Sequence, residues 1–102
     1  NCSKLNLVRI QNMVMSIGKR AFSGCFNLTN LILPPHLRTI GANAFNSCSS
    51  LTAMTVPKST SRIDNGAFAY CTALRRLAIP RNAKCSNNDI IRGSSQAKLV
   101  KY

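Results

Sequence analysis

The sequence predicts an α/β repeat solenoid, a stack of similar coils with short parallel strands, one strand per 23-residue unit and about four units. Three observations support this fold class. The chain has an internal period of 23 residues, each copy contains a short apolar run that ends in proline, and 102 residues suit one small domain. Residues 1–102 are therefore expected to form a single solenoid domain.

The period is carried by three copies of one motif. They read IGKRAFSGCFNLTNLILP from Ile17, IGANAFNSCSSLTAMTVP from Ile40 and IDNGAFAYCTALRRLAIP from Ile63. Side chains 23 positions apart are therefore expected to become neighbours in space. The predicted units are 17–39, 40–62 and 63–85, with a partial unit at 1–16 and a degenerate terminal cap at 86–102.

The columns that recur in every copy are expected to face the interior of the stack. One unit alone buries too few of these side chains to offset the entropy of ordering its backbone, so neighbouring coils must supply the rest. The columns hold Ile17, Ile40 and Ile63; Ala21, Ala44 and Ala67; Phe22, Phe45 and Phe68; Cys25, Cys48 and Cys71; Leu28, Leu51 and Leu74; Leu31, Met54 and Leu77; Leu33, Val56 and Ile79. The last unit places in them Ile90, Ile91, Ser94, Ala97, Val100 and Tyr102.

Residues 31–33, 54–56 and 77–79 are predicted to form the parallel strands. In each run the apolar residues alternate with a period of two, and the run ends at a proline, which cannot donate a hydrogen bond to a sheet. The stretch from Ile17 to Cys25 combines Ala, Phe and Cys with Gly, which predicts a tight turn followed by a short helical or 3₁₀ segment.

The repeat resembles the BspA-like class of leucine-rich repeats, whose units run approximately L-x-x-I-x-I-P, a turn, I-G-x-x-A-F and then x-x-C. The motif I-G-x-x-A-F-x-x-C-x-x-L recurs almost unchanged, and the resemblance is strong over residues 2–83 and weak over 84–102. The family implies an adhesion, cell-surface or partner-binding solenoid without catalytic residues. It leans towards a cell-surface or secreted location and leaves open a subunit of an intracellular complex. This chain departs from the family in charge, because the usual units carry many acidic residues at exposed turns.

The chain is strongly basic. It has 14 Lys and Arg residues against two Asp and Glu residues, a formal net charge of +12. Such an imbalance indicates an anionic partner, which can be an acidic protein surface, RNA, an anionic glycan or a membrane surface. The alternative is that these charges are only solvated, as most surface charges are. No apolar run is long enough to span a bilayer, so no transmembrane segment is expected.

The residues between the inward strand positions are expected to form an exposed face on which a partner lies. That face is predicted to carry Leu7 and Arg9, Asn30 and Ile32, Ala53 and Thr55, Arg76 and Ala78, and Leu99 and Lys101. Basic residues of this face and of the turns beside it are the predicted partner-binding set. The set is Arg9, Lys58, Arg62, Arg75, Arg76, Arg81, Lys98 and Lys101.

The main functional hypothesis is a non-catalytic protein-interaction or scaffold module that binds an acidic partner. Such a module can serve as an accessory subunit of a larger complex. Non-specific contact with RNA phosphates and adhesion to anionic glycan or lipid are the alternatives, although few aromatic residues are free to stack on bases. An enzyme is not expected, because no nucleophile and base are paired and Asp64 and Asp89 are the only acids. No cofactor is expected.

Four of the five cysteines fall in one column of the repeat. Cys2, Cys25, Cys48 and Cys71 are expected to stack as buried free thiols, because side chains in one column run parallel and do not face each other. Cys85 lies outside the column and is the candidate for a reactive or intermolecular thiol. No metal site is expected, since the sequence has no C-x-x-C motif and only one histidine.

Overall fold

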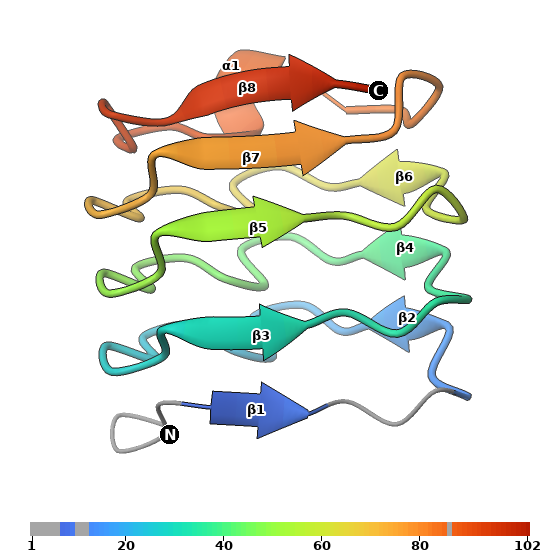
Figure 1. Ribbon diagram of the computed structural model, residues 1–102, viewed down its shortest axis with the longest axis horizontal. Helices are drawn as coiled ribbons and strands as arrows, with labels where there is room; N and C mark the ends of the chain where they lie inside the picture. Colours follow the sequence, from blue (N-terminus) through green and yellow to red (C-terminus); the bar gives the residue numbers. More distant parts are fainter. Residues whose placement is uncertain (1–6, 10–12, 86) are drawn as a thin grey trace.

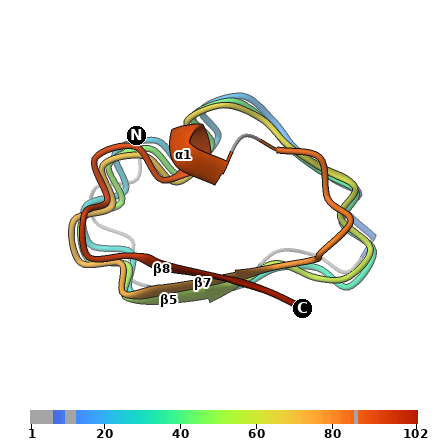
Figure 2. The ribbon, with the colours of Figure 1, turned by 90° about the horizontal axis from the view of Figure 1, so that it is seen from above.

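The computed structural model describes residues 7–9, 13–85 and 87–102, and it shows an open stack of coils (Figure 1). Successive coils lie almost directly over one another when the stack is seen along its axis (Figure 2). The repeat solenoid is therefore confirmed. The prediction for Cys2 lies outside the described residues.

One long side of every coil contributes a strand to a surface that we call the front face. Its strands are β1 (Leu7–Arg9), β3 (Asn30–Ile32), β5 (Ala53–Thr55), β7 (Arg76–Ile79) and β8 (Lys98–Lys101). Neighbouring strands are parallel, and partners such as Ala53 and Arg76 are 23 positions apart. The strands β3 and β5 begin and end one residue earlier than predicted, because the outward residue before the first inward one also joins the strand.

A second sheet, which the sequence did not predict, runs along the opposite side of the stack (Figure 1). It consists of the two-residue strands β2 (Ser16–Ile17), β4 (Thr39–Ile40) and β6 (Arg62–Ile63), paired in the order β2-β4-β6. Each strand ends in a buried isoleucine of the repeat. The coils of β1, β3 and β5 thus have two strands each, with the isoleucine column in the second one, whereas the β7 coil adds only an isolated bridge from Lys84 to Arg62.

The I-G-x-x-A-F segments turn without forming a helix in the described coils before the last one. Two backbone positions in each of these coils have positive φ. The first is Arg20 (61°), Asn43 (58°) or Gly66 (70°), and the second, four residues later, is Gly24 (75°), Ser47 (64°) or Tyr70 (57°). These conformations interrupt α-helix geometry, so the predicted helical segment is replaced by a chain of turns. The described residues contain one helix, the four-residue α1 (Asn87–Ile90) of the last coil, and none that is long and apolar enough to cross a bilayer.

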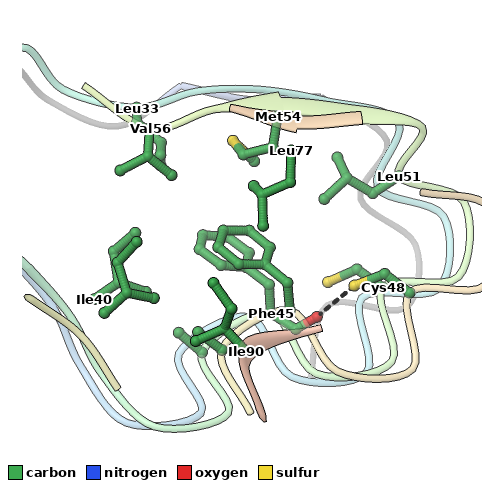
Figure 3. Packing of buried hydrophobic residues seen from close by; sticks show 14 of the residues in the cluster. Leu33, Ile40, Phe45, Cys48, Leu51, Met54, Val56, Leu77 and Ile90 are labelled. Atoms are coloured by element: carbon green, nitrogen blue, oxygen red, sulfur yellow. Dashed lines mark hydrogen bonds between the residues drawn. The ribbon is translucent and has the colours of Figure 1, made fainter. Parts of the chain in front are cut away.

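The core is a set of columns that run along the axis of the stack (Figure 3). The ring of Phe45 lies between those of Phe22 and Phe68, with centroid distances of 5.3 and 5.1 Å and interplanar angles of 2° and 8°. Phe45 and Phe68 are fully buried, and Ile90 of α1 is buried in the same cluster. The predicted core columns are therefore confirmed, with Ala21 and Tyr102 as exposed exceptions.

The cysteine column fastens each coil to the one before it. The Cys48 thiol donates a hydrogen bond to the Phe22 carbonyl at 3.2 Å, and the Cys71 thiol donates to the Phe45 carbonyl at 3.2 Å. Ser94 occupies the same column in the last coil, as predicted, and its hydroxyl donates to the Phe68 carbonyl at 2.7 Å. The side chains of this column therefore satisfy backbone carbonyls inside the stack.

The prediction of a free thiol is wrong for Cys25. Cys25 is buried, as expected for the column, but it is disulfide-bonded. Cys48 and Cys71 are free and fully buried, so the prediction is confirmed at these two positions.

The last strand pairs one residue out of step with the repeat. Arg76 pairs with Lys98 and Leu77 with Leu99, an interval of 22 residues in place of 23. Leu99 is consequently packed against the core, whereas the sequence placed it on the exposed face. Ala78, also predicted to be exposed, is buried, with an exposed fraction of 5%.

Candidate binding surface

The period-two alternation of the short strands builds the front face. On β5, Ala53 and Thr55 are exposed and Met54 between them is buried. On β3, Ile32 points outward and is 69% exposed, which is unusual for a large aliphatic side chain. The front face is thus open to solvent and apolar in the middle of the stack, as the sequence predicted.

A shallow apolar hollow lies on the front face between β3 and β5. Its volume is about 400 Å³, and no charged residue lines it. The hydrogen-bonded ladder is interrupted here, because among the described strands β3 pairs with β1 while β5 pairs with β7. The lining residues are Leu31, Ile32, Leu33, Ala53, Met54, Thr55 and Pro57. Such a hollow suits an aliphatic side chain of a partner.

Three exposed cations, which we call the front-face cations, gather at the start of the neighbouring strands. They are Arg75, Arg76 and Lys98. Arg76 and Lys98 are register partners on β7 and β8, and the Lys98 backbone N–H donates to the Arg75 carbonyl at 2.8 Å. Since adjacent strands are only about 4.8 Å apart, the fold holds like charges close together.

Both carboxylate side chains of the protein are occupied elsewhere. Asp64 pairs with Arg62 at 3.1 Å, and Asp89 pairs with Arg92 at 2.9 Å. Because the sequence contains only two acidic residues, no other acidic side chain is available to the front-face cations. Their positive potential is therefore compensated only by solvent ions or by a bound partner.

The other five predicted partner-binding residues lie on other elements or at the far end of β8. Arg62 is on β6 of the opposite sheet, whereas Lys58 and Arg81 lie in the turns that follow the prolines. Lys101 is exposed at the end of β8. Arg9 belongs to β1, and the structure does not describe its side chain. The structure thus places three of the eight predicted cations next to one another at the start of β7 and β8.

A second hollow, which the sequence analysis missed, involves Tyr102. The sequence placed Tyr102 in an inward column, but its side chain is 37% exposed and its hydroxyl donates a hydrogen bond to the Val56 carbonyl. Lys58 lies over its ring, with 5.9 Å between Nζ and the ring centroid. These contacts join residues more than 40 positions apart in the sequence, so no local sequence motif predicts them.

The thiols of Cys48, Cys71 and Cys85 are poorly activated. Desolvation raises the pKa of Cys48 to about 11 and that of Cys71 to about 12. Burial also raises the pKa of the half-buried Cys85, and nearby Lys101 opposes that shift. The thiolate form, which is the nucleophile, is therefore scarce near neutral pH. Within the described part of the chain, no three His, Cys, Asp or Glu residues are grouped as metal ligands would be.

The chain matches the model of the BspA type leucine-rich repeat region (6 copies) over residues 1–101. The chain belongs to this family. The BspA-type motif accounts for the isoleucine, Ala-Phe, cysteine and leucine columns that build the core. A search of curated proteins finds no match to this BspA-type chain.

Two solved structures are similar to this BspA-type chain. The crystal structure of a leucine-rich repeat protein of T. pallidum is 25% identical, with a TM-score of 0.86 over 98% of this chain and 47% of that protein. A leucine-rich cell surface protein from Faecalibacterium prausnitzii A2-165 is 23% identical, with a TM-score of 0.66 over 95% of this chain and 32% of that protein. The BspA-type chain thus spans less than half the length of either protein.

Proposed function

We propose that this protein is a non-catalytic protein-binding module whose front face binds an acidic partner, and that it serves as an accessory or scaffold part of a larger assembly. Leucine-rich repeats are in general a non-catalytic interaction fold, which supports this class of function. The proposal depends on one observation. An apolar hollow lies on the open front face, and three exposed cations without acidic side-chain partners lie at the start of β7 and β8 of that face.

The chemistry of the front face specifies the partner. An aliphatic side chain that enters the hollow buries apolar surface against Ile32, which contributes most of the affinity. Carboxylates placed near Arg76 and Lys98 accept charge-assisted hydrogen bonds and set the orientation. The partner segment is therefore expected to combine aliphatic and acidic residues.

RNA fits the front face less well than an acidic protein does. Base recognition and non-specific single-strand binding both rely on aromatic side chains that stack on bases. The large exposed hydrophobic residue that lines the front-face hollow is the aliphatic Ile32, and the exposed aromatic Phe26 and Tyr70 are not among the lining residues. The front face thus offers phosphates a few cations and offers bases no stacking platform.

Selection from a displayed random-peptide library, followed by fluorescence anisotropy of the selected peptides, tests the proposal. Selected peptides are expected to carry Asp or Glu beside aliphatic residues. Arg75→Glu combined with Arg76→Glu should weaken their binding at least about tenfold, since it replaces attraction by repulsion. Ile32→Asp should weaken the same peptides, because it places a charge beside the apolar hollow.

The matched control is Lys58→Glu combined with Arg81→Glu. It changes the net charge by the same amount, but both residues lie in the proline turns, away from the front face. Peptide binding should survive in this control, and circular dichroism should show that all variants are folded. Selection of neutral peptides, or equal weakening by both double substitutions, would show that the front face is not the binding site.

A further inference from the structure

The hollow at the proline turns is a candidate site of its own. It lies between the turns that follow Pro57 and Pro80 in two successive coils, and its volume is about 250 Å³. Its lining is mostly polar or charged. The lining residues are Lys58, Ser59, Thr60, Ser61, Pro80, Arg81, Asn82 and Tyr102. Sites for drug-sized ligands measure about 300–1,000 Å³, so this hollow suits a single ring or a comparably small group.

Two cations stand in the same column of the repeat at this hollow. Lys58 and Arg81 are 23 positions apart and both are exposed, so they occupy equivalent places in adjacent coils. Asp64 and Asp89 form ion pairs with arginines elsewhere, so neither Lys58 nor Arg81 has an acidic side chain as a partner. Two cations that line one hollow favour a negatively charged group between them.

Tyr102 forms an ordered aromatic wall of the hollow. Its backbone N–H donates to the Ile79 carbonyl at 3.0 Å, and its carbonyl accepts from the Arg81 N–H at 2.7 Å. The side chain is held at its far end by the hydrogen bond from its hydroxyl to the Val56 carbonyl. A ring held at both ends loses little entropy when a ligand packs against it.

The serine hydroxyls of the hollow are already committed as donors. The Ser59 hydroxyl donates to the Leu37 carbonyl at 2.6 Å, and the Ser61 hydroxyl donates to the Arg38 carbonyl at 3.3 Å. Their remaining capacity is as acceptors, since a hydroxyl has one proton and two lone pairs. A bare sulfate or phosphate ion offers few or no protons to such acceptors, whereas sugar hydroxyls do.

We propose that this hollow binds an anionic saccharide, with a sulfate or carboxylate between Lys58 and Arg81, a sugar ring against Tyr102, and sugar hydroxyls donating to Ser59 and Ser61. The four features match four properties of one ligand class: negative charge, a ring with apolar faces, hydroxyl donors and small size. The site is separate from the front face, so it stands or falls independently of the protein partner proposed above.

Isothermal titration with a heparin-derived hexasaccharide tests the site. The wild-type protein is expected to bind it, and Lys58→Glu combined with Arg81→Glu should weaken binding at least about tenfold. Arg75→Glu combined with Arg76→Glu is the matched control, since it makes the same change of net charge on the front face. Retained binding in that control supports a local site, and equal weakening by both pairs would reduce the interaction to diffuse charge and overturn the proposal.

Two further titrations identify the ligand chemistry. A chemically desulfated hexasaccharide keeps its carboxylates, so retained binding assigns the anionic group to carboxylate and lost binding assigns it to sulfate. Inorganic sulfate should displace the hexasaccharide only weakly. Displacement by sulfate at comparable concentration, or equally tight binding of a single-stranded RNA to the same site, would overturn the saccharide assignment.

Tyr102 separates saccharide recognition from simple anion binding. Tyr102→Ala should weaken the hexasaccharide severalfold and leave the weak binding of inorganic sulfate unchanged, because only the sugar ring uses the aromatic wall. Tyr102→Phe keeps the ring and removes the hydrogen bond to Val56, so it is expected to retain most of the affinity. Unchanged hexasaccharide binding by Tyr102→Ala would show that the ring is not part of the site.

Discussion

At the scale of single residues, the cysteine column shows how one small side chain serves packing and hydrogen bonding together. The thiol of Cys71 is fully buried and donates to the Phe45 carbonyl, while its own backbone N–H donates to the Ser94 hydroxyl at 2.8 Å. A larger residue would not fit between coils, and a residue without a donor would leave a buried carbonyl unsatisfied. Cysteine and serine meet both conditions.

We predict that the protein loses stability as the solution becomes alkaline. Burial raises the pKa of Cys71 from 9.0 to about 12 and that of Cys48 to about 11, so above about pH 9 the unfolded chain releases these protons first. The contribution of the two buried thiols to the free energy of unfolding is fully present below that pH, and it falls by about 1 kcal/mol per thiol by about pH 10. Urea unfolding at neutral and alkaline pH measures the change.

The serine of the last coil supplies the control for this measurement. Cys71→Ser keeps a donor for the Phe45 carbonyl, as Ser94 does for the Phe68 carbonyl. The variant is expected to fold and to lose part of the alkaline dependence, because a hydroxyl does not titrate in this range. An identical pH dependence in wild type and variant would rule out the Cys71 thiol as its source.

At the scale of elements, the stack of phenylalanine rings joins the turns of neighbouring coils. Phe45 is fully buried between two parallel rings, whereas Phe22 at the edge of the described stack is only half-buried. Stacked aromatic pairs add to the stabilisation that comes from buried area alone. The central ring therefore contributes more than the outer one.

Phe45→Ala is expected to lower the free energy of unfolding by about 3–5 kcal/mol, and Phe22→Ala by clearly less. The reason is the cavity that the smaller side chain leaves in a packed column. The midpoints of urea unfolding of the two variants, each compared with the wild type, measure the two losses. Equal losses for both substitutions would mean that the rings do not act as a stack.

The I-G turns contain a matched pair of glycines with different surroundings. A Cβ at Gly41 would lie 2.6 Å from the backbone nitrogen of Lys19 in the preceding coil, whereas a Cβ at Gly18 meets nothing within 4 Å. Gly41→Ala is therefore expected to cost about 1–3 kcal/mol. Gly18→Ala should be neutral or slightly stabilising. Thermal unfolding of both variants decides the point, and equal stability would show that adjacent turns are not in close contact.

At the scale of the whole molecule, charge is the property that sets this chain apart. The chain has fourteen Lys and Arg residues and only two Asp residues. Both aspartates are already in exposed ion pairs, which contribute little stability. Cations in one column are held near each other by the coil spacing, as Arg76 and Lys98 are. Folding therefore concentrates like charge, and a bound anion relieves the repulsion.

Added salt is expected to raise the melting temperature of the free protein. The Debye length falls from about 30 Å at 0.01 M to about 8 Å at 0.15 M salt, which screens the repulsion between coils. Differential scanning calorimetry in sodium chloride measures the rise. A melting temperature that falls over this range would indicate that ion pairs stabilise the fold more than repulsion weakens it.

The binding surfaces were less accessible to sequence reasoning than the fold. The outward positions of β5 followed from alternation alone, and Ile32 and Arg76 were placed correctly on the front face. The eight predicted cations come from the strand face and from the turns beside it, and Arg62 lies on a strand of the opposite sheet, which the sequence pattern did not predict. Periodicity tells which residues align along the axis of the stack, but not where each column sits around the coil.

A period of 23 residues was enough to settle the stack, its parallel front strands and its core columns, because repeated side chains can bury one another only in register. The second sheet, the disulfide bond at Cys25, the shift of β8 and the position of Tyr102 became known only from the folded molecule. Each of them depends on contacts between different coils or on the closing of a turn. Such contacts form only when the coils are assembled into the stack, so the local sequence pattern does not predict them.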